Sequence, residues 1–212
     1  MNTKAMNPTT AFVKARRGEI TRQKIVRQAA PLFNQHGYAG TSMSELMAAT
    51  GLEKGGLYRH FESKEALAAA AFDYAWETVS APRQRGIEQR DGALEKLSLL
   101  VRNFVEETPH RLPGGCPLLN TAVDSDDGSP VLRDKARTAL AEWRSEIADL
   151  VRAGLAVGDL RPDIDPDSVA VVMISALEGG IMMCRLEQSR EPLRMVGMHL
   201  EKYLRSLQIE KA

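Results

Sequence analysis

The sequence lacks several features that would mark an exported, membrane-bound or metal-stabilised protein. Its two cysteines, Cys116 and Cys184, lie far apart and form no Cys-x-x-Cys pair or Cys/His cluster. A structural zinc site needs closely spaced ligands, so we expect no metal and no cofactor. No run of 18 apolar residues is unbroken, and the first residues lack the continuous apolar core of a signal peptide. These absences predict a cytoplasmic protein that does not span a membrane.

Signals for β-strands are equally scarce. Aromatic residues make up only 5% of the chain, and alternating stretches of β-branched residues are missing. Apolar residues instead recur every three or four positions, as at Ile25, Ala29 and Leu32, which is the spacing of one helix face. We therefore predict an all-α fold. Pro31 lies inside this first helix and predicts a kink there, while Gly37 is expected to end the helix.

The formal net charge is zero, but the charges are unevenly distributed. Residues 1–67 carry ten Lys or Arg against five Asp or Glu, whereas residues 68–212 carry eighteen against twenty-three. A basic N-terminal part joined to an acidic remainder favours a polyanionic partner for the N-terminal part alone. Many soluble proteins share such an asymmetry, so the charge pattern by itself leaves the function open.

Local signals predict two short helices separated by a turn, followed by a long helix. The segment Ser42–Glu45 is a capping box that begins a helix, and Gly51 ends it. A second short helix is expected at residues 54–60, and Ser63 is a suitable N-cap for a long fourth helix that Pro82 should end or bend. Two short helices around a glycine-containing turn are the geometry of a helix-turn-helix.

Three residues in this region are hard to explain by stability alone. Gly55 and Gly56 lie in one short helix, where each costs about 1 kcal/mol relative to alanine. A close approach of the backbone to a DNA strand would explain both glycines. Lys64 places a cation in the first turn of the fourth helix, where the helix dipole disfavours it, unless a phosphate lies between its ammonium and the free N–H groups.

The run Gly37–Leu67 resembles the DNA-binding domain of the TetR/AcrR family. The specific block reads Leu-Tyr-Arg-His-Phe at residues 57–61 and Ser-Lys-Glu-Ala-Leu at residues 63–67. The resemblance implies a three-helix DNA-binding domain at residues 18–78 and a larger helical effector-binding and dimerisation domain at residues 79–212. The residues expected to lie against phosphates or base edges are Ser42, Met43, Glu53, Lys54, Gly55, Gly56, Tyr58, Arg59, His60 and Lys64.

The sequence departs from the family pattern in places. Position 53 is usually Ser or Thr, and Glu53 is a poorer cap whose carboxylate can accept a hydrogen bond from cytosine in the major groove. Thr50 stands where Ala is frequent, and Pro31 is uncommon at its position. Ahead of the domain, a basic arm either reaches the minor groove or is a solvated tail. Its cations are Lys14, Arg16 and Arg17.

The second half of the chain also has helical periodicity. A Pro/Gly-rich break is expected at residues 109–117, and Ser129 followed by a proline should begin a helix. The segment at residues 114–128 resembles one subgroup of TetR-type C-terminal domains, but much less specifically than the N-terminal block does. The helices are expected at residues 92–107, 129–154, 167–188 and 192–208.

Two sets of residues follow from the family layout. Small residues in the helix expected at residues 167–188 suit a homodimer interface formed by the last two helices, although packing within one chain explains them as well. Apolar and Met-rich positions suit an effector cavity, although each residue could simply belong to the core. The interface candidates are Ser175, Gly179, Gly180 and Met182. The cavity candidates are Phe72, Trp76, Phe104, Leu118, Trp143, Ile147, Met173 and Met183.

The resemblance therefore implies a sequence-specific regulator of transcription rather than an enzyme. It would bind double-stranded operator DNA as a homodimer and act as a repressor that a small, largely apolar effector releases. One rival hypothesis is an enzyme with Cys116 as nucleophile and His110 as base, but no third orienting group is evident. Another is an architectural nucleic-acid binder, against which the acidic second half argues.

Overall fold

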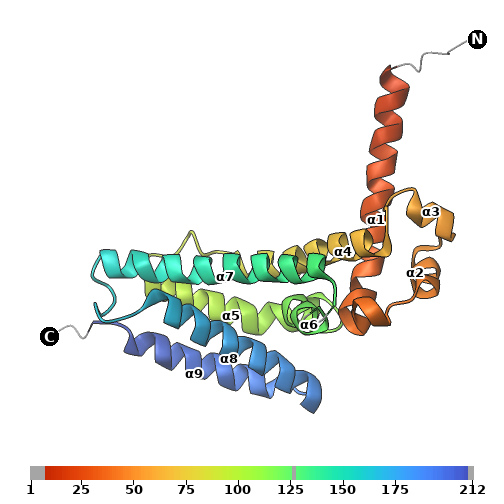
Figure 1. Ribbon diagram of the computed structural model, residues 1–212. Helices are drawn as coiled ribbons and strands as arrows, with labels where there is room; N and C mark the ends of the chain where they lie inside the picture. The colour runs from red at the N-terminus through yellow and green to blue at the C-terminus, as the bar shows by residue number, and fades with distance from the viewer. Residues whose placement is uncertain (1–7, 126–127, 210–212) are drawn as a thin grey trace, which may run out of the picture.

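The protein is helical throughout the described chain. The computed structural model describes residues 8–125 and 128–209, with side chains from residue 18 onward except residues 108–111. Within these residues no strand is present beyond an isolated bridge between Leu160 and Gln208. Figure 1 shows a small head formed by the first helices, with α1 rising from it, and an elongated body formed by the others. The all-α prediction is confirmed.

The head comprises α1 (Pro8–Gly40), α2 (Met43–Thr50), α3 (Lys54–Tyr58) and the first turns of α4 (Lys64–Ser80). These helices share one small core, which each of them contacts with its apolar side. The core residues come from all of these helices and from the loop before α4. They are Ile25, Val26, Ala29, Leu46, Leu57, Phe61 and Leu67.

The caps predicted for the head are confirmed. The Ser42 hydroxyl accepts a hydrogen bond from the Glu45 backbone N–H (3.2 Å), and the Glu45 carboxylate accepts one from the Ser42 backbone N–H (2.7 Å). Gly51 ends α2 in the left-handed region (φ 67°), and Ser63 Oγ accepts a hydrogen bond from the Ala66 N–H at the start of α4. Each cap satisfies a backbone group that the helix end leaves free.

The irregularity in α1 occurs at the glycine rather than at the proline. Gly37 has φ 74° and ψ 173°, whereas Pro31 keeps helical dihedral angles. Gly37 therefore ends the regular part of α1, as expected, and a separate turn follows as far as Gly40. A proline removes one hydrogen bond but tolerates a helical φ, whereas a positive φ costs glycine no steric energy. The helix end predicted at Gly37 is confirmed, and Pro31, where a kink was predicted, keeps helical dihedral angles.

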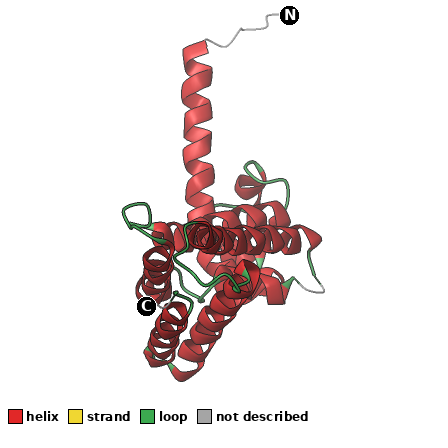
Figure 2. Cartoon of the chain, turned by 90° about the vertical axis from the view of Figure 1, so that its left-hand side faces the viewer, coloured by secondary structure: helices red, strands yellow, loops and turns green. Residues whose placement is uncertain are grey.

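The body is a bundle around one large apolar core. A short 3-10 helix, η1 (Ala81–Gln84), follows α4, and the bundle is then built by α5 (Ala93–Arg111), α7 (Pro130–Ala156), α8 (Pro166–Glu187) and α9 (Glu191–Ser206). Figure 2, which views the body end-on, shows these helices running alongside one another. The head and body meet through α4, which belongs to both.

Helix α6 (Pro117–Asp124) was not predicted. We expected a break at residues 109–117, but α5 continues to Arg111 and α6 starts at Pro117. A proline at the first helical position lacks only an N–H that would have no partner there, so Pro117 begins a helix where we interpreted it as part of a break. In Figure 1, α6 lies where the body meets the base of α1.

Helix α8 is long and apolar enough to cross a membrane by length and composition, with a mean hydropathy of 1.7 over its best window. The search of the sequence for an unbroken run of 18 apolar residues did not detect this helix. The helix packs against α7 on one side and α9 on the other, and it contributes Met173, Leu177 and Ile181 to the core. A core helix of a helical bundle satisfies the same criteria, so this finding is weak evidence for a membrane span.

Candidate functional site

The face of the head formed by α2 and α3 is polar and open. Glu53, Lys54, Gly55, Tyr58 and Arg59 are all exposed, and 43% of the Tyr58 surface is accessible. The structure therefore brings most of the predicted DNA-binding residues together along one short helix and the turn before it. Leu57 is buried beneath them, as a residue of the head core.

Among the described residues, no packing contact requires either of the two glycines of α3. A Cβ added at Gly55 would meet nothing within 4 Å, and one added at Gly56 would make ordinary contacts with Leu52 at 3.5 Å or more. Neither glycine has a positive φ. The fold would therefore accept alanine at both positions, and alanine would favour the helix. No contact among the described residues requires the small size of either glycine.

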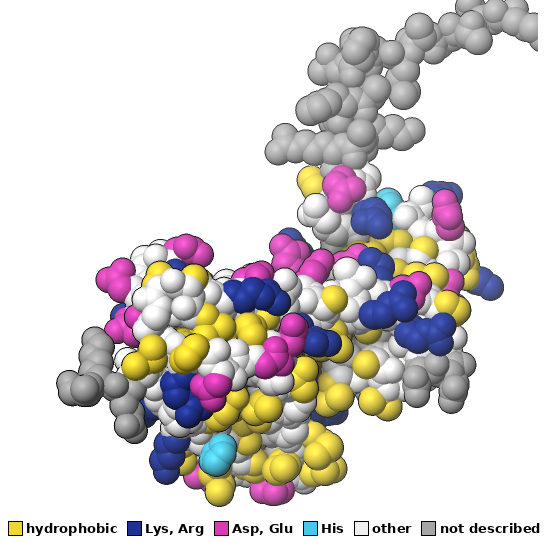
Figure 3. All heavy atoms as spheres, turned by 60° about the vertical axis from the view of Figure 1, so that its left-hand side comes forward, with side chains coloured by type: hydrophobic (Ala, Val, Ile, Leu, Met, Phe, Trp, Pro, Cys, Tyr) yellow, Lys and Arg dark blue, Asp and Glu magenta, His cyan; other side chains and the backbone are white. Residues whose placement is uncertain are grey.

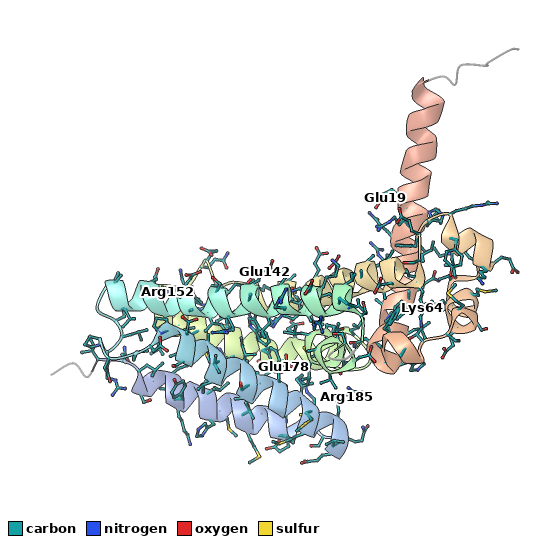
Figure 4. The ribbon with its side chains drawn as sticks, in the orientation of Figure 1. Glu19, Lys64, Glu142, Arg152, Glu178 and Arg185 are labelled. Atoms are coloured by element: carbon teal, nitrogen blue, oxygen red, sulfur yellow. The ribbon has the colours of Figure 1, made fainter. Side chains whose placement is uncertain are left out.

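Some predicted contact residues already have partners within the chain. The Lys64 ammonium donates a hydrogen bond to the Tyr38 carbonyl oxygen (2.6 Å) and lies 4.5 Å from the centre of the Tyr38 ring. Figure 4 shows Lys64 where α4 passes beside the base of α1. Ser42 caps α2, and Met43 is half-buried against the head core. These side chains hold the head together, and Lys64 keeps two further N–H groups for another acceptor.

Glu53 is a poor helix cap, as the sequence indicated. It occupies the N-cap position of α3, but its side chain makes no capping hydrogen bond. The carboxylate is exposed beside Lys54, whose ammonium lies 6.0 Å from the centre of the Tyr58 ring. His60 is half-buried at the end of this segment. The turn before α3 thus presents one acceptor among donors, which is a suitable arrangement for reading a base edge.

A polar junction links the head to α6, and it was missed by sequence reasoning. The Tyr38 backbone N–H donates to Asp124 Oδ2 (2.7 Å), directly after the Gly37 break. The Asn34 amide donates to the Pro113 carbonyl oxygen (2.7 Å), and the Asn120 amide donates to the Asn34 carbonyl oxygen (3.0 Å). No local pattern marks these residues, because each one depends on a partner some 80 positions away in the chain.

The interior of the body contains most of the predicted cavity residues. Phe72, Phe104, Leu118, Trp143, Ile147 and Met173 are buried, and Trp76 is partly buried against them. The three aromatic rings of Trp76, Phe104 and Trp143 are neighbours: Trp143 lies 5.9 Å from Trp76 edge-to-face and 5.7 Å from Phe104 in a stack.

Met183 does not belong with these residues. Its side chain is 45% exposed on the outer side of α8, where it lines a groove of about 550 Å³ between α8 and α9. Met173 lies ten positions earlier on the same helix, and ten residues are nearly three helical turns, a spacing that rotates the side chain by about 80° away from the core. The prediction of Met183 as a cavity residue is therefore wrong.

Sequence reasoning also missed a set of buried polar residues beside the three rings. Arg83, from η1, is only 4% exposed. The Cys116 thiol, at the start of α6, donates a hydrogen bond to Glu178 Oε1 of α8 (2.9 Å). Burial lowers the pKa of Arg83 and raises the pKa of Glu178. Figure 4 shows Glu178 inside the body, between α8 and the helices above it.

The environment of Cys116 does not suit a nucleophile. The residue is buried, and burial raises the pKa of its thiol well above the ordinary value, with the nearby Glu178 carboxylate adding to the effect. A nucleophilic cysteine needs the opposite shift, toward thiolate at neutral pH. The side chain of His110, its proposed base, lies outside the described residues. Within the described chain no group of three His, Cys, Asp or Glu side chains is placed to hold a metal ion.

The dimer candidates divide into two groups. Ser175 and Met182 are exposed, and a Cβ at Gly179 would meet nothing within 4 Å. Gly180, in contrast, is buried, and a Cβ there would lie 2.9 Å from Leu193 Cδ1. Gly180 therefore serves the packing of α8 against α9 within one chain, so its prediction as an interface residue is wrong.

The outer surface of α8 and α9 is unusually apolar. Figure 3 shows hydrophobic side chains gathered on the lower part of the body, where these two helices lie. Soluble monomers seldom expose so many large apolar side chains together. Those on α8 and α9 with at least 44% of their surface accessible are Val171, Val172, Met182, Met183, Leu186, Met195 and Met198.

Comparison with known proteins agrees with this geometry. The family model described as "Bacterial regulatory proteins, tetR family" matches residues 25–71, and that described as "Tetracyclin repressor-like, C-terminal domain" matches residues 93–200. A TetR transcriptional regulator from Chloroflexus aurantiacus has a similar crystal structure, with a TM-score of 0.86 and 45% identity, covering 91% of this chain and 98% of that one.

Two further relatives are more distant. The HTH-type transcriptional repressor DhaR of Mycobacterium sp. (strain GP1) is 28% identical over 173 residues, covering 81% of this chain and 86% of the relative. The TetR family transcriptional regulator CifR, solved with a 26-bp double-strand operator DNA, has a TM-score of 0.74 and 24% identity, covering 85% and 94% of the two chains. At 24% identity, the similarity to CifR shows a shared fold and nothing more.

Proposed function

Because the chain belongs to the TetR family of bacterial regulatory proteins, we propose that it is a repressor that binds operator DNA as a homodimer and leaves it when a small effector binds the body. The observation that carries this proposal is the open α3 helix with two glycines that no contact within the chain requires. The named repressor DhaR supports the same interpretation. Such a protein acts in the cytoplasm and is not an enzyme.

On the head, α3 is the element that enters the major groove. Gly55 and Gly56 let its backbone approach the DNA, and Glu53 with Lys54 and Arg59 reads base edges or neighbouring phosphates. Tyr58, His60 and Lys64 position the head on the sugar-phosphate backbone. Ser42 and Met43 hold α2 in place at the edge of the contact. We assign the head to residues 18–78 and the body to residues 79–212.

The apolar surface of α8 and α9 is the dimer interface in this proposal. Two copies of this surface would bury each other's exposed methionines and valines in a four-helix arrangement, with the same patch used on both chains. A two-fold dimer places its two α3 helices about 34–36 Å apart, or at a multiple of that distance. The operator would then be a pseudo-palindrome whose half-sites have matching spacing.

DNA binding is tested on duplexes selected from a random library by the purified protein. We expect a pseudo-palindromic consensus, a gel shift that saturates at two chains per duplex, and a dimer mass by light scattering. Replacing Met195 and Met198 by glutamate should give monomers with weak DNA binding. A stoichiometric complex of one chain on one duplex would contradict the proposal.

A further inference from the structure

A groove of about 320 Å³ lies where the connection between α5 and α6 meets the turn between α8 and α9. Its apolar lining comes from Leu112, Pro113 and Ile181, and its charged lining comes from Arg185 and Arg190. No acid lines this groove, whereas four other pockets of the described chain each include at least one Asp or Glu. Because acids outnumber bases in residues 68–212, a groove whose charges are all positive distinguishes this part of the body.

The side chain of Arg185 lies across the backbone of the connection between α5 and α6. A Cβ added at Gly115 would lie 2.8 Å from Arg185 Cδ, and Gly115 has φ 89°, a value that favours glycine. Any other residue at this position would displace the arginine side chain. Figure 4 shows Arg185 near the end of α8 that is closer to the head. The glycine therefore allows the guanidinium group to reach the wall of the groove.

Contacts within the described chain use only part of the two guanidinium groups. Arg185 Nη1 donates to Asn120 Oδ1 at the long distance of 3.4 Å. Arg190 Nη2 donates to the carbonyl oxygens of Val105 (3.0 Å) and Glu106 (3.3 Å). A guanidinium group has five N–H donors, so each arginine keeps several for another acceptor. Among the described residues, neither arginine has a carboxylate partner within 4.0 Å.

The helix ends explain part of this arrangement. Arg185 lies in the last turn of α8, where the helix dipole favours a cation. Arg190 satisfies two carbonyl groups of α5, which a neutral donor could also do. These roles require one charge from the first residue and one donor from the second. They do not require two guanidinium groups in a single groove that has apolar walls and no acid.

We propose that this groove binds a small organic acid, with the carboxylate held by Arg185 and Arg190 and the apolar part of the ligand against Leu112 and Ile181. The planar guanidinium group binds a carboxylate through paired N–H···O hydrogen bonds, a geometry that an ammonium group cannot provide. The apolar lining favours an organic acid over an inorganic anion, which has no apolar surface to bury. The inference goes beyond the proposed function and does not depend on DNA binding.

The groove is distinct from the other surfaces of the body that have been assigned a role. None of its lining residues belongs to the apolar surface of α8 and α9, so the proposed dimer and a bound acid would use different residues. The groove does adjoin the junction with the head. Asn120, the partner of Arg185, also donates to the carbonyl oxygen of Asn34 in α1 (3.0 Å). A bound acid would therefore be linked to α1 through Arg185 and Asn120.

A cysteine of the groove reports on its occupancy. Cys184 lines the groove and is half-buried, whereas Cys116 is buried elsewhere in the body. We would measure the rate at which iodoacetamide alkylates Cys184 in the full-length protein, by peptide mass spectrometry at constant ionic strength. The probes are benzoate, its neutral isostere benzamide, and inorganic phosphate. A fragment of this size binds with a dissociation constant on the order of 1 mM, so about 10 mM benzoate should slow the alkylation at least threefold. Benzamide and phosphate should leave the rate unchanged.

Two substitutions test the role of the arginines. Arg185→Met should abolish the protection by benzoate. Ser189→Asp should also abolish it while keeping both arginines, because it adds a carboxylate to the groove, and it retains an acceptor for the Glu191 N–H at the start of α9. The matched control is Arg194→Met, since Arg194 is exposed on α9 and lines a different groove. This variant should keep the protection.

Rates with and without each probe are compared within one variant, because a substitution near Cys184 can change its intrinsic reactivity. Circular dichroism establishes that each variant is folded. Equal protection by benzamide would show that the groove recognises apolar surface alone, and equal protection by phosphate would show an unselective anion site. Either result would overturn the inference. The absence of protection by benzoate in the wild-type protein, or its persistence in folded Arg185→Met or Ser189→Asp protein, would overturn it as well.

Discussion

The head and the body of this protein each have a feature that contacts within the described chain do not explain, and the two features differ in kind. On the head, Gly55 leaves space at the surface that no side chain of the chain uses. In the body, Arg83 and Glu178 are buried, and each keeps one polar atom without a partner. The first feature lies on the surface, where it leaves room for a close approach from outside. The second lies inside the bundle, where it places charged groups against aromatic rings.

The largest expected effect concerns the body. Phe104→Ala removes a ring that is 1% exposed and stacked on Trp143, and we expect it to lower the free energy of unfolding by about 3–5 kcal/mol. Urea denaturation followed by circular dichroism measures the change. Val157→Ala, at a side chain that is 72% exposed, is the control and should change stability by less than about 0.5 kcal/mol. Equal effects of the two substitutions would mean that the ring cluster does not support the body.

A second substitution tests whether a body glycine serves packing. A Cβ at Gly154 would lie 2.6 Å from Ala93 Cβ and 2.8 Å from Leu160 Cδ1. Gly154→Ala should therefore destabilise the protein by about 1–3 kcal/mol, despite the higher helix propensity of alanine. Thermal unfolding measures the shift. A stabilised variant would show that the bundle relaxes easily around this position.

The same substitution on the head should have the opposite sign. Gly55→Ala adds a Cβ in open space, so we expect a gain in stability of up to about 1 kcal/mol together with weaker operator binding. The control is Gly18→Ala, in α1, where an added Cβ also meets nothing within 4 Å. It should gain stability and keep its affinity. Unchanged affinity of Gly55→Ala in a gel shift would remove the main support for a close approach of DNA.

The smallest effects separate the positioning residues of the head from the reading residues. Lys64→Ala should weaken binding to all duplexes alike and reduce the slope of log affinity against log salt by about 0.9, the value for one phosphate contact. Glu53→Ala should instead relax the base preference at one position and leave that slope nearly unchanged. Binding measured at several salt concentrations on matched and mismatched duplexes distinguishes them, and identical behaviour of the two variants would contradict the division.

Sequence alone predicted the features that depend on a few neighbouring residues. The Ser42 capping box, the left-handed Gly51 and the Ser63 cap were predictable because their partners lie within four positions. The family resemblance supplied the DNA-binding role that we expect of the α3 region. Gly180 and Met183 were misassigned because the side of α8 that faces α9 is fixed by packing, and apolar residues line both sides of that helix.

The residues that sequence reasoning missed depend on partners from distant helices. Arg83 follows a proline in a short connection, a position where an arginine is usually solvated, and only the convergence of α4, α5 and α7 encloses it. Helix α6 was missed because Pro117 was interpreted as a break. Its contacts with Asn34 and Tyr38 therefore could not be foreseen either.

The peptide unit of Tyr38 also determines how the protein can be recombined. Its N–H is held by Asp124 of the body, and its carbonyl oxygen is held by Lys64 at the start of α4. A head transplanted onto the body of a relative would keep the second bond and lose the first, unless the new α6 carries an acceptor at the equivalent place. The interchangeable unit is therefore the head together with α6. A chimera joined within α4 should unfold cooperatively only if its head and its α6 come from the same parent.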